Sequence, residues 1–293
     1  MPVALIGNNW GGRSQQTLID YVVAQAETCD LMAFTEVNHL PGTDGTVPLY
    51  MTNPRDKASG LHDQIMLNQF EVLSQELYWT HAPYFTAENC HTYMCASGAK
   101  YPQTQYGNAL FTHCSIDVIE TGSIFILGEF NGTLENGSSP RVLQYVVFRM
   151  NGQWYLFAHF HGVWYKCPRT GNTKSDGPLR VTQSANVLTT LEKIAAKYAV
   201  EKVVFGGDFN LDIDTHALRM FEQGSAAGLM KFRNLIKEFG ITNTRTPLYR
   251  EWGNPDASMF ADYVFVSKAV QVHELTRVGF KTSDHVHLQL DFS

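Results

Sequence analysis

Short apolar runs and amphipathic stretches alternate along the chain, which is typical of buried strands mixed with surface helices. Val3–Ile6 predicts a short buried strand, and Leu31–Phe34 predicts a second one, buried on both faces and ending at Glu36. Between them, apolar residues recur every four positions from Leu18 to Ala26. This spacing predicts a helix, which Ser14 would cap. The chain therefore begins with a β–loop–α–β unit.

The middle of the chain is rich in strand-like segments. Asn151-Gly152 separates two of them, and this dipeptide is a strong signal for a tight hairpin. Residues 41–60 and 80–106 are polar, rich in Gly and Pro or studded with aromatic residues, and they predict long surface loops. The strand-like segments are Ala109–Phe111, Ser123–Leu127, Val142–Met150 and Gln153–Phe160.

The last third predicts two helices and then a return to strands. An apolar stripe covers residues 187–198, and a second stripe covers residues 229–239, just before Gly240 at the expected C-terminal stop. The buried strand Val203–Phe205 lies between these helices and runs into Gly206-Gly207-Asp208. The remaining strands are predicted at Tyr263–Val266, Val272–Val278 and Val286–Phe292.

No internal repeat, linker or shift in composition interrupts this order of elements. Many strands interleaved with a few helices favour the α/β (α+β) class. The expected architecture is a four-layer α/β sandwich, in which two packed mixed β-sheets are flanked by helices. We expect residues 1–293 to form a single domain.

Composition excludes several classes of protein. The 293 residues are 44% hydrophobic and 17% charged, which is too apolar for a disordered chain. No apolar run approaches the roughly 20 residues that span a bilayer, so we expect a soluble protein. It would be cytoplasmic, or secreted after removal of a signal that this chain does not contain. The net charge of −6 argues against a non-specific DNA coat.

Polar side chains collect where the predicted strands end. In layered α/β folds such side chains meet in loops that the strands hold rigidly. Carboxylate and amide oxygens suit Mg²⁺, and two histidines that titrate near neutral pH can serve as acid and base. Together they fit metal-assisted hydrolysis of a phosphate ester. These residues are Asn9, Glu36, His159, His161, Asp208, Asn210, Asp284 and His285.

Six segments follow the order of motifs in a known family. Gly206–Asn210 looks like its G-D-x-N motif, Ser283–His285 resembles its terminal S-D-H motif, and Asp30–Val37 resembles its metal-ligand strand. The other three segments are Ala261–Ser267, Tyr106–Ala109 and Asn9–Gly11, which are similar to the D-Y-h-h-h-S, G-N-A and N-h-x-G motifs. On these segments the chain resembles the endonuclease/exonuclease/phosphatase superfamily, which has the deoxyribonuclease-I-like fold.

The resemblance implies a metal site formed by residues from several of these segments. Glu36 would be the principal ligand of Mg²⁺, with Mn²⁺ as a possible substitute, and Asn9 and Asp284 would support the ion or its water shell. Asp208 and Asn210 would position or activate the attacking water and hold the phosphate.

The resemblance also implies a pair of catalytic histidines. His285 would be one of them, oriented by Asp262, because a carboxylate bonded to an imidazole fixes its tautomer and raises its basicity. The G-N-A position makes Asn108 a candidate for substrate binding.

The second histidine falls where the chain departs from the family pattern N-T-H-h. Residues 157–162 read F-A-H-F-H-G, so one alignment selects His161 and the other selects His159. Strand alternation sends both side chains to the same face, so the pattern alone leaves both open. We favour His161, because it lies nearer the strand end and precedes Gly162, and we assign His159 to substrate binding.

A basic and aromatic segment directly follows this strand. Within residues 163–180, Lys166 and Arg169 stand close to Trp164 and Tyr165, a combination that suits stacking on bases and contact with a phosphate backbone. We therefore expect a Mg²⁺-dependent phosphodiesterase, most plausibly a nuclease acting on DNA or RNA. The alternatives are a phospholipid (sphingomyelinase-like) or inositol phosphate hydrolase, and a non-catalytic binding protein on the same fold. The last would be expected to lack one of the site residues.

Overall fold

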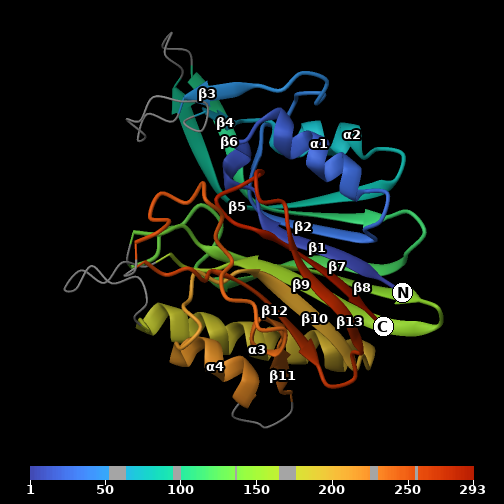
Figure 1. Cartoon of the computed structure of the whole chain (residues 1–293). Coiled ribbons are helices and arrows are strands. Elements are labelled where there is room, and N and C mark those ends of the chain that lie inside the picture. Colours follow the sequence, from blue (N-terminus) through green and yellow to red (C-terminus); the bar gives the residue numbers. More distant parts are fainter. Residues whose placement is uncertain (53–63, 95–99, 136, 165–175, 225–229, 255–256) are drawn as a thin grey trace.

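Two six-stranded sheets lie face to face, with helices on their outer faces (Figure 1). The computed structural model describes the chain except for residues 53–63, 95–99, 136, 165–175, 225–229 and 255–256. The two sheets and their covering helices make four layers. The expected α/β sandwich of two mixed sheets flanked by helices is therefore confirmed.

The first sheet has the strand order β13-β14-β1-β2-β6-β5. Its strands β1 and β2 run parallel, and the other pairs are antiparallel. The bounds are β1 Val3–Asn8, β2 Leu31–His39, β5 His81–Met94, β6 Lys100–His113, β13 Val272–Val278 and β14 His287–Phe292.

The second sheet has the order β11-β12-β10-β9-β8-β7 and repeats this plan, with β9 and β10 as its parallel pair. The bounds are β7 Asp117–Leu127, β8 Arg141–Met150, β9 Gln153–His161, β10 Lys202–Asp208, β11 Phe232–Asn234 and β12 Asp262–Ser267. A small third sheet pairs β3 (Tyr50–Thr52) with β4 (Gln64–Met66).

Helices cover the outer face of each sheet. The helices α1 (Gln16–Gln25) and α2 (Gln69–Glu76) lie against the first sheet, and α3 (Pro178–Tyr198) and α4 (His216–Gln223) lie against the second (Figure 1). A 3-10 turn η1 (Trp10–Gly12) follows β1, and the short helix α5 (Leu235–Glu238) follows β11.

Strand alternation explains why the central strands are apolar throughout. In β1, Ile6 packs into the core between the two sheets, and its neighbour Leu5 packs against the helical side with Leu18 and Val22 of α1. Both faces of the strand are thus buried, which requires a continuous apolar run. Burial of these faces fixes the register that places the strand ends together.

One predicted loop and one predicted strand end are corrected by the structure. The prediction of a long loop at residues 80–106 is wrong, because most of this segment forms β5 and β6. Its polar composition fits an edge strand, since β5 is last in its sheet, and Tyr84 and Phe85 still pack on opposite faces. Strand β2 also continues past Glu36 to His39 instead of ending there.

Two predictions about helices are also wrong. Residues 232–238 form β11 and the short helix α5 instead of one long helix, and Asn234 caps α5 by accepting from the backbone N–H of Ile236 at 3.1 Å. The helix α4 was not foreseen. The predicted Ser14 cap is absent, because α1 begins at Gln16 without a side-chain cap and the Ser14 hydroxyl has no partner among the described residues.

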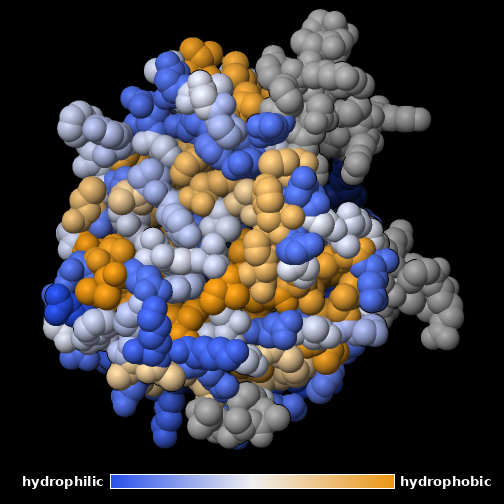
Figure 2. Space-filling view, turned by 180° about the vertical axis from the view of Figure 1, so that it is seen from behind, coloured by the Kyte–Doolittle hydropathy of each residue, from blue (hydrophilic) through white to orange (hydrophobic). Residues whose placement is uncertain are grey.

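The rear of the molecule carries apolar areas near its middle (Figure 2). The edge strand β7 exposes four apolar side chains, Val118, Ile119, Ile124 and Phe125. In the part of the chain that the structure describes, no helix has the length and apolar character needed to cross a bilayer.

Candidate active site

The carboxyl ends of the two parallel pairs meet between the sheets. Asp208 at the end of β10 lies opposite His161 at the end of β9, and β1 and β2 run alongside from the other sheet. Close approach of β9 and β10 needs Gly207, whose φ is 130° and where a Cβ would lie 2.2 Å from the carbonyl oxygen of Phe160. The glycine before Asp208 is therefore what allows the two strand ends to come together.

Glu36 enters the site from a bulge in β2. The pairing of β2 with β6 shifts between Phe34 and Val37, and Glu36 has a φ of 56° there. This left-handed conformation costs a residue with a Cβ about 1–3 kcal/mol, and bulges often re-aim a side chain at a functional site. The bulge is why β2 can deliver Glu36 inward and still continue as a strand.

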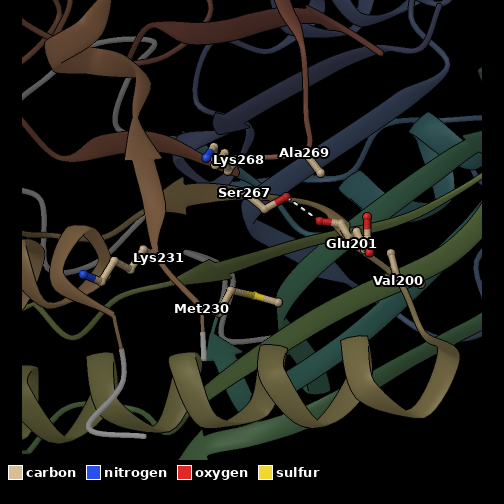
Figure 3. A pocket seen from close by; sticks show the side chains of 7 residues that line it. All are labelled: Val200, Glu201, Met230, Lys231, Ser267, Lys268 and Ala269. Carbon is tan, nitrogen blue, oxygen red and sulfur yellow. Dashed lines mark hydrogen bonds between the residues drawn. The ribbon is translucent and has the colours of Figure 1, made fainter. Parts of the chain in front are cut away.

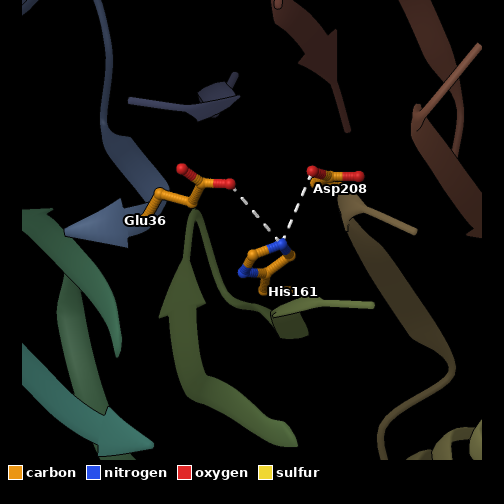
Figure 4. A group of neighbouring side chains, drawn as sticks. All are labelled: Glu36, His161 and Asp208. Carbon is orange, nitrogen blue, oxygen red and sulfur yellow. Dashed lines mark ion pairs between the residues drawn. The ribbon is translucent and has the colours of Figure 1, made fainter. Parts of the chain in front are cut away.

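Two carboxylates and an imidazole converge at the ends of β1, β9 and β10 and at the bulge of β2. The Asn8 amide donates to Oε1 of Glu36 at 3.1 Å and to Oδ2 of Asp208 at 2.9 Å. Nε2 of His161 lies 3.8 Å from that Glu36 oxygen and 3.7 Å from that Asp208 oxygen (Figure 4). One ligand atom from each of Glu36, His161 and Asp208 lies within 4.8 Å of the others.

This group fits a divalent cation. Burial raises the pKa of Glu36, and the carboxylates of Asp284 and Asp208 raise it further against the hydrogen bond from Asn8. Carboxylates accept hydrogen bonds only, so several of them together are stabilised by a positive ion. The oxygens of Glu36 and Asp208, supported by Asn8, are ligands of the kind that Mg²⁺ prefers.

A carboxylate–imidazole pair stands on the other side of Asp208. Nδ1 of His285 lies 2.7 Å from Oδ2 of Asp262, and both side chains are buried. Nε2 of His285 lies 3.7 Å from Oδ2 of Asp208 and 3.8 Å from Oδ1 of Asp284. Asp262 thus holds one ring nitrogen and leaves Nε2 facing the site.

The charges around His285 set its pKa. Burial and the guanidinium of Arg245 lower the pKa, but the carboxylates of Asp262, Asp208 and Asp284 outweigh both and raise it to about 9. Burial raises the pKa of Asp262 to about 6, against the attraction of His285. Around neutral pH the pair therefore consists of a carboxylate and an imidazolium.

The chain as a whole matches the model of one protein family. The model described as the endonuclease/exonuclease/phosphatase family aligns with residues 10–285, nearly the whole chain. The protein belongs to this family. The resemblance drawn from the six sequence motifs is thereby confirmed. A separate comparison with curated proteins found no match to the chain.

Several solved structures share the fold of the chain. A mannosyl-6-phosphatase from Bacteroides thetaiotaomicron is 14% identical with a TM-score of 0.64, and 100% of each chain is covered. The human Nocturnin catalytic domain, solved with a bound sulfate anion, is 14% identical with a TM-score of 0.62, covering 100% of this chain and 94% of that one. Truncated TDP2 from Caenorhabditis elegans is 16% identical with a TM-score of 0.55, covering 99% and 96%.

One asparagine of the predicted site is shifted by a residue. Asn8 and not Asn9 contacts Glu36 and Asp208. In β1 the side chain of Asn8 points to the same side as Ile6, into the space between the sheets, whereas Asn9 comes after the strand. The Asn9 amide is buried and has no hydrogen-bond partner among the described residues. The structure thus brings Asn8, and not Asn9, to the two carboxylates.

The structure separates the two candidate histidines. His161 faces the carboxylates, whereas His159 lies deeper along β9, fully buried, with Nε2 2.6 Å from Oε1 of Gln144. Asn108 is also buried, and its amide donates to the carbonyl oxygen of Val142 at 3.2 Å. Its Oδ1 has no partner among the described residues.

Asn210 is fixed beside Asp208 by its own backbone. Its φ is 52°, its N–H donates to Oδ1 of Asp208 at 2.9 Å, and its amide donates to the carbonyl oxygen of Gly162 at 3.1 Å. Asn210 thereby tethers Asp208 to the turn after β9. Lys166 and Arg169, predicted to contact substrate, lie outside the described residues.

Sequence reasoning missed two arginines near the site. Arg141 at the start of β8 is buried and pairs with the buried Glu88 of β5 at 2.9 Å, and burial raises the pKa of that carboxyl to about 7. Arg245 lies in a loop that no motif marks. Its backbone forms an isolated β-bridge with His285, 40 positions away. That non-local pairing leaves no periodic signal in the sequence.

A large pocket elsewhere in the molecule is not the active site. It holds about 560 Å³ and lies at the start of β10 and the end of β12, the opposite ends of these strands from Asp208 and Asp262 (Figure 3). Its lining is Val200, Glu201, Met230, Lys231, Ser267, Lys268 and Ala269. This lining has no histidine and a single carboxylate, so it lacks the groups that the family chemistry requires.

Proposed function

We propose that the protein is a divalent-metal-dependent phosphodiesterase, that its substrate is a nucleic acid, and that residues 1–293 act as one catalytic domain. The observation that carries this proposal is the position of Asp208. Its Oδ2 lies 3.7 Å from Nε2 of both His161 and His285, with Glu36 on one side and Asp262 on the other. Enzymes of the family hydrolyse phosphoester bonds.

The metal belongs on the Glu36 side. Glu36 and Asp208 would supply the carboxylates that hold Mg²⁺ or Mn²⁺, Asn8 orients both of them, and Asp284 would support the ion or its water shell. When bound, such an ion offsets negative charge on the phosphoryl oxygens and orients the reacting groups.

The residues around the metal site divide the proton chemistry. Asp208, tethered by Asn210, accepts a hydrogen bond from the attacking water and directs it at phosphorus. His285 carries a proton on Nε2 and donates it toward the leaving oxygen, while Asp262 holds Nδ1. His161 orients the phosphate or the ion from the opposite side of Asp208.

Aromatic groups beside the site support a nucleic acid substrate. The ring of Tyr106 lies 6.4 Å from that of His161, and Trp164, three residues after His161, is 53% exposed. Exposed aromatic rings next to a phosphodiester site suit stacking on bases. The basic residues Lys166 and Arg169 follow Trp164 directly in the sequence and would extend this surface.

Hydrolysis of a sugar phosphate monoester is the second candidate. It is favoured by the similarity to the mannosyl-6-phosphatase, in which all of both chains is covered. The two candidates differ in whether the ester phosphate carries one substituent or two, and the geometry of the metal and histidine groups serves both.

A substrate panel tests the proposal. The purified protein with Mg²⁺ or Mn²⁺ is assayed against single- and double-stranded DNA, RNA, mannose 6-phosphate, inositol phosphates and sphingomyelin. We expect cleavage of nucleic acid, abolished by Asp208→Asn. Turnover of the sugar phosphate alone selects the second candidate, turnover of inositol phosphates or sphingomyelin alone excludes the nucleic acid assignment, and turnover of none contradicts the proposed function.

A further inference from the structure

Arg245 is placed against the acid–base histidine by the backbone. Arg245 and His285 face one another across an antiparallel β-bridge, and side chains of such a pair lie on the same side. Nη1 of Arg245 lies against Nε2 of His285 and 3.5 Å from Oδ2 of Asp284. When the imidazole is protonated, both nitrogens carry an N–H group, and neither accepts from the other. Any oxygen that hydrogen bonds to Nε2 of His285 would therefore also lie next to Nη1 of Arg245.

The guanidinium of Arg245 is held by its neighbours, and one of its N–H groups has no acceptor among the described residues. It stacks on the ring of Tyr249 at 4.4 Å, and the side chain is only 11% exposed. Its Nε is buried and has no hydrogen-bond partner among the described residues. A buried N–H without an acceptor costs about 1–3 kcal/mol, so an incoming anionic oxygen would be favoured here. Planar guanidinium groups match phosphate oxygens well.

The charge of the site makes such a cation necessary for binding an anion. The carboxylates of Glu36, Asp208 and Asp284 lie beside the two histidines at the site, and that of Asp262 lies directly behind His285. A divalent ion offsets two of these four negative charges and Arg245 offsets a third. The imidazolium of His285 offsets the fourth, so removal of Arg245 would leave one net negative charge, which would repel a phosphate ester.

We propose that Arg245 binds a non-bridging oxygen of the substrate's phosphoryl group, next to His285, and that Tyr249 holds its guanidinium in place. This inference rests on the proposed function and adds to it the residue that recognises the phosphate. The arrangement follows from the β-bridge and the stacking contact, and it is independent of which alcohol the phosphate is esterified to.

Binding of inorganic phosphate tests the proposal without turnover. Calorimetry with Mg²⁺ present is performed on the wild-type protein, Arg245→Met and Arg245→Lys. A lost charge-assisted hydrogen bond of about 1.5–3 kcal/mol predicts roughly 10- to 100-fold weaker phosphate binding for Arg245→Met, with partial recovery in Arg245→Lys. The matched control is Arg149→Met, because Arg149 also stacks on an aromatic ring and pairs with a carboxylate, but far from the site.

Three further readouts separate this role from a structural one. Mg²⁺ affinity should not fall in Arg245→Met, because removal of a positive charge does not weaken a cation site, thermal stability should be retained, and KM for an ester substrate should rise more than kcat falls. Phosphate affinity within twofold of the wild type would overturn the proposal, and so would no measurable binding to the wild type or an equal loss of Mg²⁺ affinity. Loss of phosphate binding in a protein that hydrolyses no ester would instead retain Arg245 as an anion ligand and contradict only the proposed function.

Discussion

The two histidines that flank Asp208 have similar burial and opposite electrostatic surroundings. Each is 4% exposed, and each has its Nε2 3.7 Å from the same Asp208 oxygen. His161 has a buried Nδ1 without a partner among the described residues, whereas Nδ1 of His285 is held by Asp262. Burial and the nearby Arg141 lower the pKa of His161 to about 3, whereas the pKa of His285 is raised to about 9.

The contrast shows that neighbouring charges, and not burial, assign the roles of the two histidines. At neutral pH, His161 is a neutral imidazole that can donate to a phosphoryl oxygen or accept from a ligand. His285 is a cation with a proton to give. The site is therefore divided into a metal side, with Glu36 and His161, and a proton-donating side, with Asp262 and His285.

Removal of the metal side should have the largest effect. We expect excess chelator to reduce phosphodiesterase activity to background, and Mg²⁺ or Mn²⁺ to restore it. Glu36→Gln should lower activity by about 10³-fold or more, because it removes a charge that holds the ion. The control is Glu274→Gln in the exposed part of β13. Full activity in chelator would contradict the division.

Removal of the proton-donating side should come next. His285→Ala should lower kcat by about 10²–10⁴-fold, the usual range for a lost proton transfer. Asp262→Asn should reproduce part of this loss, because it disturbs the tautomer of His285, and the double variant should lose no more than His285→Ala alone. Additive losses in the double variant would show that Asp262 acts independently of His285.

The assignment of His161 is tested against its neighbour on the same face of β9. His161→Gln should lower kcat about 10²-fold, whereas His159→Gln, which replaces a ring that hydrogen bonds to Gln144 and not to the site carboxylates, should cost less than about tenfold. Steady-state kinetics on both variants, with thermal stability as the folding control, separates the two. The reverse order would move the site by two residues and leave His161 as a packing residue.

The asparagine at the end of β1 offers a test of the metal side with a smaller expected effect. Asn8→Ala should weaken Mg²⁺ affinity by about 10-fold, because Glu36 and Asp208 lose a shared donor. Asn9→Ala should leave Mg²⁺ affinity unchanged, since the Asn9 amide bonds to neither carboxylate. Titration of Mg²⁺ against both variants gives the comparison, and equal losses would contradict the register that the structure assigns.

Much of the fold and of the site could be predicted from sequence, because continuous apolar runs mark the buried central strands. The apolar run before Glu36 and the glycines before Asp208 mark strand ends, and family motifs link them. The motif pointed to Asn9, because Trp10 supplies the hydrophobic position after it, whereas strand alternation brings Asn8 to the two carboxylates. Arg245 carried no signal, because a β-bridge between distant residues brings it to His285.

The errors in the fold have a related cause. The edge strand β5 is last in its sheet and mostly half-buried over residues 81–90, so its sequence is polar, like that of a loop. At residues 229–239, apolar spacing matched a helix, but pairing of β11 with β12 overrides that local preference. Local pattern was thus informative where a segment is buried on both faces and misleading at the edges of the sheets.

The smallest expected effects are on the free energy of unfolding as a function of pH. His161 should control the acid side of this curve, and His285 should control the alkaline side. The pKa of His161 falls from 6.5 to about 3, so stability falls as the pH drops below 6.5, because only the unfolded chain takes up the proton. The pKa of His285 rises from 6.5 to about 9, so its contribution is complete below pH 6.5 and is lost as the pH rises through 9.

Denaturant unfolding of the metal-free protein from pH 4 to 10 measures both limbs. His161→Gln should flatten the acid limb, by at most about 1.4 kcal/mol per pH unit, and His285→Gln should flatten the alkaline limb. The acid limb should persist in part, because His159 and His287 also have lowered pKa values, of about 3 and about 4. Identical profiles for both variants would contradict the contrast.

The central claim, that the two histidines hold opposite protonation states, is tested most directly by NMR titration of their Cε1–H signals in the metal-free protein. The signals are assigned with His161→Gln and His285→Gln. We expect His285 to keep its proton up to about pH 9 and His161 to stay neutral down to about pH 3. Titration of both near their ordinary pKa of 6.5, or in the reverse order, would contradict the account.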